Sequence, residues 1–352
     1  MLRHTRTVVG VLLSIFLLWF LFRDTDWQVL SSVLRQVDVS WLLLAFFLSF
    51  SSFVIRVQRW SYVVRATQPA TFRSMFSATQ IGLLVNCLVP ARIGDVVRAY
   101  VLANLEKISF TRSLTLVALD RINDILALVT VLLIALLSFP SDVDIEFAVG
   151  AFGNAEPFVV SSSLMQPVTV SLIGALFIVI AILVFLYFRQ DIVLRFLDRV
   201  VEPLSPQTAA WLSTMFLNFA TGMHIFRSGL QMAKAILLSL VTWGLVVLSL
   251  AALLKAFHLE FPWYGPFLML AILGVFTAVT VTPGMVGQYH VPVVASLLMI
   301  LPGMNVNEAK AVAIVAHLVA LLPPVVLGVY SMLSEKLHIY DLIPERDKKK
   351  VD

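Results

Sequence analysis

The chain has 352 residues, of which 60% are hydrophobic and 13% are charged, and its formal net charge is +4. Soluble domains contain about 45–50% apolar and about 25% charged residues. The composition therefore excludes an ordinary soluble protein and predicts an all-α, polytopic integral membrane protein. The single cysteine, Cys87, excludes an internal disulfide.

Six apolar segments are long enough to cross a bilayer, which takes about 20 helical residues with some allowance for tilt. The first, residues 7–22, precedes charged residues instead of a small-residue cleavage site, so we interpret it as a retained signal anchor. The other expected crossings are residues 41–55, 114–139, 168–188, 235–257 and 311–333.

The distribution of basic residues predicts the orientation, because cytoplasmic loops carry an excess of Lys and Arg. Most of the 25 basic residues fall on one side if the N-terminus is cytoplasmic. The acidic loop at 140–166, which has no Lys or Arg, then lies outside. We expect a multi-pass protein of the cell membrane with both termini in the cytoplasm.

Two further apolar segments are too short or too interrupted to cross in the same way. Residues 76–89 are flanked by Arg73 and Arg92, so this segment is expected to enter from the cytoplasm and return. Residues 266–282 and 291–301 flank a break at 283–287 and are expected to form a hairpin from the outer side. Re-entrant broken hairpins from opposite faces are typical of an inverted repeat with a mid-membrane site. The alternative is two pairs of ordinary short helices packed in the bundle.

The first break carries most of the charge. Residues 86–98 read N-C-L-V-P-A-R-I-G-D-V-V-R, and Pro90 should interrupt the helix. If a new helix begins near Arg92, Asp95 can pair with Arg92 or Arg98 on one face. Free amides at a helix start favour an anion, and Arg binds phosphate in two-point fashion, so a lipid phosphate is the expected ligand. The alternative is that the arginines only anchor the segment at the interface.

Three more charges follow on the next predicted helix. Asp120 and Asp124 lie four residues apart and share a helix face, whereas Arg121 lies about 100° around from Asp120. We expect one or both acids to neutralise an arginine of the first break. A proton relay is the alternative, because buried carboxylates can have raised pKa values.

These motifs carry a family resemblance. The residues 86–100, the L-D-R-I-N-D sequence at 119–124, the T-P-G-M-V-G sequence at 282–287 and the later helix with Pro323, Pro324 and Gly328 resemble a flippase-like family. This is the family of the transmembrane region of lysylphosphatidylglycerol synthase, whose members are proposed to move lipids or lipid-linked sugars. The synthase carries an additional soluble aminoacyl-transferase domain that is absent here. The resemblance therefore implies translocation without the synthase chemistry.

The second motif departs from the family pattern, which usually reads P-G-G-x-G followed by a glutamate, with an arginine in the next helix. Here Met285 replaces the second glycine, His290 stands at the glutamate position and His317 lies near the arginine position. Because a histidine side chain ordinarily titrates near neutral pH, this pair could respond to a change in proton concentration. Alternatively, they pack and hydrogen-bond between helices.

The remaining polar segments are cytoplasmic in this prediction. Residues 191–202 have the spacing of an in-plane amphipathic helix, and the placement of the apolar residues 209–226 stays open. Residues 341–352 form a basic tail that attracts anionic lipid, and residues 1–340 form a single transmembrane domain.

The sequence thus predicts translocation of a phospholipid or a polyprenyl-phosphate-linked glycan between leaflets. The alternatives are a secondary transporter of a small anion and a non-transporting accessory protein of a membrane glycosyltransferase. We expect no enzyme, cofactor or metal site and no nucleic-acid partner, because catalytic and metal-ligand spacings are absent from the sequence. The expected partner is a membrane lipid or lipid-linked sugar, with a homo-oligomer possible in principle. The candidate substrate-binding residues are Asn86, Arg92, Asp95, Arg98, Asp120, Arg121, Asp124, Pro283, Gly284, Gly287, His290 and His317.

Overall fold

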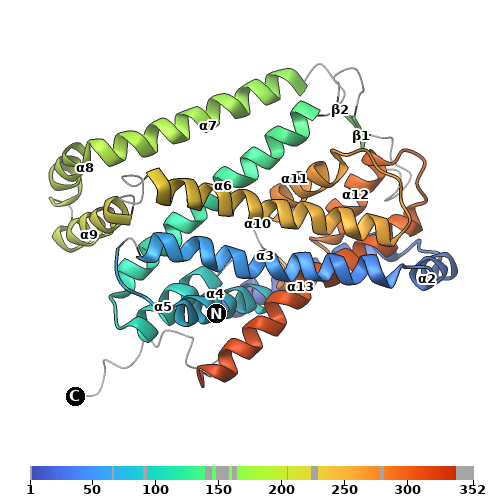
Figure 1. Cartoon of the computed structure of the whole chain (residues 1–352), viewed down its shortest axis with the longest axis horizontal. Coiled ribbons are helices and arrows are strands. Elements are labelled where there is room, and N and C mark those ends of the chain that lie inside the picture. The colour runs from blue at the N-terminus through green and yellow to red at the C-terminus, as the bar shows by residue number, and fades with distance from the viewer. Residues whose placement is uncertain are drawn as a thin grey trace.

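The structure, a computed structural model, describes residues 2–65, 67–89, 93–138, 145–147, 158–160, 165–203, 205–222, 229–277 and 281–337. The helices are α1 (Leu2–Phe22), α2 (Trp27–Arg35), α3 (Val39–Arg65), α4 (Phe72–Leu88), α5 (Gly94–Glu106), α6 (Phe110–Ser138), α7 (Met165–Phe188), α8 (Gln190–Phe196), η3 (Leu197–Val201), α9 (Pro206–Gly222), α10 (Gly229–Ala256), α11 (Gly265–Thr277), η5 (Pro283–Met285), α12 (His290–Ile300) and α13 (Val306–Ser334). Two short strands, β1 (Ile145–Phe147) and β2 (Phe158–Val160), pair antiparallel between α6 and α7. The predicted all-α polytopic membrane fold is confirmed (Figure 1).

Within the described ranges, six helical segments are long and apolar enough to span a membrane. Five match predicted crossings, namely Val39–Arg65, Phe110–Ser138, Gln166–Phe188, Ala233–Ala256 and Val306–Ser334. The sixth is Pro283–Ile300, which we had assigned to the second broken hairpin, whereas the predicted first crossing corresponds to the shorter apolar helix Val9–Phe22. The beginning of α1 is too polar to extend that apolar helix to full length.

Two pairs of short helices lie toward opposite ends of the long axis of the molecule (Figure 1). α4 and α5 form the first pair, and α11 and α12 form the second. Each pair has its own apolar core, with Met75 and Leu102 in one and Met269 and Leu297 in the other. This arrangement agrees with two broken hairpins entering from opposite sides. The inverted repeat itself, and the membrane face at each end, stay predictions.

Two glycines allow α4 and α5 to pack closely. A Cβ on Gly94 would lie 1.9 Å from the carbonyl oxygen of Gly82. The two helices could therefore not pack this closely if residue 94 had a side chain. The Asn86 side chain spans the break and accepts a hydrogen bond from the Gly94 N–H at 2.8 Å. α4 ends at Leu88, and Val89 is extended, as the residue before a proline should be.

A second side-chain amide fastens the other break. Gln288 accepts hydrogen bonds from the backbone N–H groups of Val281 (3.0 Å) and Thr282 (3.3 Å). It also donates to the carbonyl oxygen of Phe276 at 2.7 Å, near the end of α11. Each hairpin break is therefore held by an amide side chain that replaces the hydrogen bonds lost from the helix.

α13 connects the two hairpins. It packs on α12 and on α4, where a Cβ on Gly328 would lie 2.8 Å from the Gln80 carbonyl oxygen. Pro323 has no N–H for the carbonyl oxygen of Val319, four residues earlier. Ser49 on α3 donates a hydrogen bond to that oxygen at 3.0 Å. The contact shows how a proline is accommodated inside a long membrane helix.

α7, α8, η3 and α9 lie at the periphery (Figure 1). α8 and η3 cover most of the predicted amphipathic segment; no residue in them is buried, and Phe196 and Val200 are exposed. α9 contains most of residues 209–226, whose location stayed open, and it packs on α6. Residues 223–228 and the predicted basic tail lie outside the described residues.

Candidate functional site

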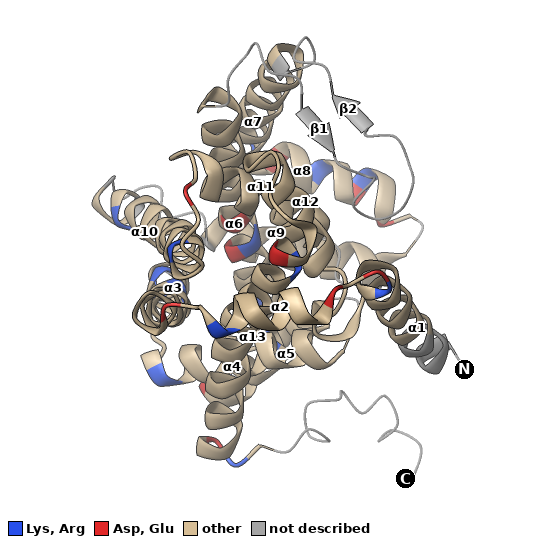
Figure 2. Cartoon of the chain, turned by 90° about the vertical axis from the view of Figure 1, so that its right-hand side faces the viewer, with Lys and Arg blue, Asp and Glu red and all other residues tan. Residues whose placement is uncertain are grey.

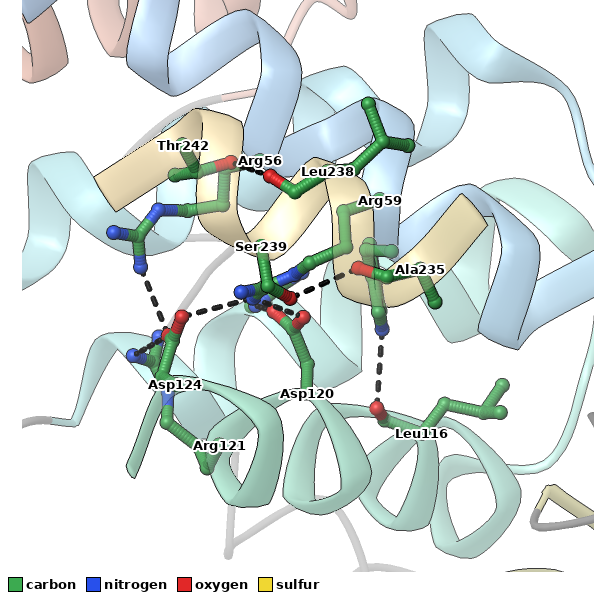
Figure 3. A network of polar contacts seen from close by, with 12 residues as sticks. Arg56, Arg59, Leu116, Asp120, Arg121, Asp124, Ala235, Leu238, Ser239 and Thr242 are labelled. Carbon is green, nitrogen blue, oxygen red and sulfur yellow. Dashed lines mark hydrogen bonds and ion pairs between the residues drawn. The ribbon is translucent and has the colours of Figure 1, made fainter. Parts of the chain in front are cut away.

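A network of charged side chains joins three helices in the interior of the bundle. Figure 2 shows acidic and basic segments of α6 near the centre of the view, and Figure 3 shows side chains of α3 and α6 pointing toward one another. Charges inside membrane proteins are costly and generally mark functional sites. The members are Arg56 and Arg59 on α3, Asp95 and Arg98 on α5, and Asp120, Arg121 and Asp124 on α6.

The deepest part of the network surrounds Asp120, which is fully buried. Its carboxylate accepts from Arg59 at 2.6 Å and from Arg98 at 2.8 Å. The guanidinium of Arg98 stacks 3.6 Å above the centre of the Trp60 ring, and the Trp60 indole N–H donates to the Leu116 carbonyl oxygen. Because Arg59 and Arg98 are 0% and 2% exposed, this part acts as a buried support and not as a binding surface.

The other part of the network faces a cavity. One oxygen of Asp124, Oδ2, accepts from both Arg56 (2.8 Å) and Arg121 (3.1 Å). Arg121 also donates to Asp95 on α5 at 2.7 Å. These four side chains alternate in charge along the cavity wall, and two guanidinium groups converge on one carboxylate oxygen.

The cavity has a volume of about 470 Å³ and lies where the two hairpin breaks meet. Asn86 and Cys87 contribute to its wall from the first break, and Gly284 and Met285 contribute from the second. A Cβ on Gly284 would lie 3.5 Å from the Cys87 carbonyl oxygen, so the two breaks touch. Apolar side chains of α6, α10, α11 and α13 form most of the remaining wall.

Sequence comparison identifies the family. The family model for the lysylphosphatidylglycerol synthase TM region matches residues 7–328. The chain belongs to this family. It is also similar to the UPF0104 membrane protein MJ1595 of Methanocaldococcus jannaschii, with 24% identity over 126 residues. That match covers 35% of this chain and 38% of the relative, so the chain spans little more than a third of the relative's length.

The structure brings together most of the residues that we predicted for this member of the lysylphosphatidylglycerol synthase TM family. Those that line the cavity are Asn86, Asp95, Arg121, Asp124, Gly284 and His317. Arg98 and Asp120 lie behind this wall, whereas Pro283, Gly287 and His290 belong to the second break without being part of the cavity lining. Arg92 lies outside the described residues.

The structure corrects two expectations about the arginines and confirms a third. Asp95 pairs with Arg121 on α6 and not with Arg98 on its own helix, because Arg98 turns toward Asp120 and Trp60. The expectation that an acid on α6 neutralises an arginine of the first motif is confirmed by the Asp120–Arg98 pair. Arg98 is too buried to anchor the segment in interfacial lipid.

Sequence reasoning missed two members of the site, Arg56 and Arg59. Both lie just beyond the predicted crossing, which ends at residue 55. α3 instead continues to Arg65, so both arginines lie within a helix. Their spacing of three residues, which puts them on one helix face, was the available signal.

The two histidines are held by packing and hydrogen bonds. The His317 ring lies 4.7 Å from His290 and 5.2 Å from Tyr289, measured between ring centres. His317 Nε2 donates to the Gly284 carbonyl oxygen at 2.8 Å, since a carbonyl oxygen only accepts. His290 Nδ1 accepts from the Gly287 N–H at 3.3 Å. These contacts agree with the interpretation of the pair as interhelical packing residues.

Met285 adopts a backbone conformation that suits the glycine it replaces in the family pattern. Its φ of 56° is left-handed, which costs an L-residue about 1–2 kcal/mol. We therefore expect Met285→Gly to be more stable than Met285→Ala by about 1 kcal/mol. Thermal unfolding in detergent measures the difference. The same two substitutions at Met299 in α12 should show the opposite order, because alanine is favoured over glycine within a helix; equal orders at both positions would contradict the prediction.

Proposed function

We propose that this protein moves a lipid with a phosphate-containing headgroup between the leaflets of the membrane. The observation that carries the proposal is the convergence of Arg56 and Arg121 on one oxygen of Asp124, in a cavity where two hairpin breaks meet. Broken helices that meet inside a membrane are typical of transporter binding sites. The headgroup occupies the cavity while the acyl chains stay in the bilayer.

The charge of the network favours an anionic group. Four arginines and three aspartates leave a formal net charge of +1. Arg56, which lines the cavity, also has a buried nitrogen, Nε, with no hydrogen-bond partner among the described residues. A guanidinium presents a planar fork of donors that matches phosphate geometry.

The proposed exchange takes place at Asp124. A phosphate oxygen replaces the Asp124 oxygen that Arg56 and Arg121 share, and Asp95 keeps Arg121 oriented toward the cavity. Asp120, with Arg59 and Arg98, supports the arrangement from behind. Binding thus breaks the two ion pairs of Asp124 Oδ2, whereas Asp124 Oδ1 keeps its pair with Arg59.

The family assignment supports the same substrate class without identifying the lipid. Either a phospholipid or a polyprenyl-phosphate-linked glycan fits the proposal, and we propose the cell membrane as the location, with both termini in the cytoplasm. We propose no chemical reaction for this chain.

Reconstituted vesicles test the proposal. We expect the protein to accelerate exchange of an acyl-labelled phosphatidylglycerol between leaflets, measured by dithionite quenching. Arg121→Gln should slow the exchange about tenfold or more, since losing a charged hydrogen bond costs about 1.5–3 kcal/mol. Arg121→Lys should retain part of the rate because it keeps the charge but not the fork.

Arg195→Gln is the matched control, because Arg195 is exposed on α8 and pairs with Asp191 away from the cavity. Its exchange rate should equal that of the unmodified protein. Exchange no faster than in protein-free vesicles would argue against lipid transfer, and uptake of phosphate or chloride in those vesicles would instead support the small-anion alternative.

A further inference from the structure

The second break has an unusual backbone that depends on another helix. Gly284, Met285 and Gly287 all have positive φ values, of 61°, 56° and 81°. The carbonyl oxygen of Gly284 is turned toward α13, where His317 donates to it at 2.8 Å. A side chain outside the hairpin therefore holds its central peptide.

His317 is itself held by rings from the same break. Tyr289 stacks on it with an angle of 28° between the ring planes, and His290 meets it edge-on at 73°. His290 in turn packs edge-on against Phe22 of α1. The three rings form a cluster that joins the second hairpin to α13, and the side chain of His317 is mostly buried there.

The same peptide is the contact point with the first hairpin. Gly284 lies against the Cys87 carbonyl oxygen near the end of α4, and Cys87, Gly284, Tyr289 and His317 all contribute to the cavity wall. The hydrogen bond from His317 therefore acts on the same glycine that touches the first hairpin.

We propose that His317 is a positioning residue that keeps the cavity closed toward the side of α11 and α12. When its bond to Gly284 opens, the second break separates from the end of α4 and the cavity becomes accessible from that side. This gate rests on the proposed function, in which the cavity holds the headgroup. The contact between the second break and the end of α4 can nevertheless be measured without any transport.

Cys87 provides the measurement, because it is the single cysteine of the chain and lies where the two breaks meet. The full-length protein in vesicles of defined orientation is exposed to a charged, membrane-impermeant methanethiosulfonate reagent added to one side. We expect His317→Leu to raise the rate of Cys87 modification about tenfold from the side of α11 and α12, through loss of one hydrogen bond and two ring contacts. From the opposite side the rate should be unchanged.

A conservative variant separates gating from general loosening. The amide of His317→Gln can still donate to Gly284, so its rate should stay within about twofold of the unmodified protein. Tyr289→Leu keeps the donor but removes the stacked ring and should give an intermediate rate; it also serves as the second test if His317→Leu does not fold. His258→Leu is the matched control, since that histidine contacts a backbone carbonyl of Gln36 away from the cavity.

The result that overturns the inference is a Cys87 modification rate in folded His317→Leu or Tyr289→Leu equal to that of the His258→Leu control. A rate that rises equally from both sides would also contradict it, because it would indicate loosening and not a gate. If Cys87 responds as expected but no lipid moves in the vesicle assay, the gate stands and the proposed substrate is wrong.

Discussion

Asp120→Asn should destabilise the protein by about 3–5 kcal/mol, the cost of leaving a buried charge without its partner. Asp120 is fully buried between Arg59 and Arg98, so the amide would leave two buried guanidinium groups without their shared carboxylate. Arg59 retains Asp124, but Arg98 keeps only its ring contact with Trp60 among the contacts described above. The midpoint of thermal unfolding in detergent should fall by more than about 5 °C.

Asp191→Asn is the matched control for this prediction. Asp191 also pairs with an arginine, Arg195, but both side chains are exposed on α8. Exposed ion pairs contribute about 0–1 kcal/mol, so the control should unfold at nearly the same temperature as the unmodified protein. Replacing Arg98 by Met and Asp120 by Leu together should recover part of the lost stability, because the pair is then removed as a whole. An Asp120→Asn protein as stable as the control would show that the network is hydrated.

Gly94→Ala should disrupt the first hairpin. The added Cβ would lie 1.9 Å from the Gly82 carbonyl oxygen and 2.6 Å from Asn86 Oδ1, so α4 and α5 would have to separate. Overpacking of this kind costs about 1–3 kcal/mol and occasionally more, and here we expect at least about 3 kcal/mol. Loss of monodisperse protein after heating, followed by size-exclusion chromatography, measures it.

The control is the same substitution at Gly244 in α10, where an added Cβ meets no atom within 4 Å. Because alanine is a better helix former than glycine by about 0.5–1 kcal/mol, Gly244→Ala should keep or slightly raise the stability. If both variants behave alike, the close approach of α4 and α5 is not required for the fold.

Periodicity, length and charge were enough to predict the class of the protein and five of its long helices. They worked because a span of about 20 apolar residues has few alternatives in a bilayer. The broken hairpins were also visible, since Pro90 and the Pro283–Gly284 pair interrupt apolar runs. The end of α3 was predicted ten residues too early because Arg56 and Arg59 resemble the basic edge of a crossing when their partners are unknown.

The candidate site was predicted as a set of residues and not as a geometry. The charges of the motif were found because ionisable residues are rare in an apolar chain. Their pairing depends on contacts between helices: Asp95 meets Arg121 from α6, and Asp124 meets Arg56 from α3. A single sequence contains no information about which of several arginines reaches a given carboxylate, so the pairing of Asp95 with Arg98 was wrong, and the alternative pairing with Arg92 lies outside the described residues.

The paired prolines of α13 have a consequence for water in the cavity. Pro323 frees the Val319 carbonyl oxygen, which Ser49 binds. Pro324 frees the carbonyl oxygen of Ala320 in the same way, and Ala320 lies in the cavity wall. We expect a water molecule to donate to that oxygen, so the cavity should hold water, which a hydroxyl or amine of the proposed lipid headgroup would displace.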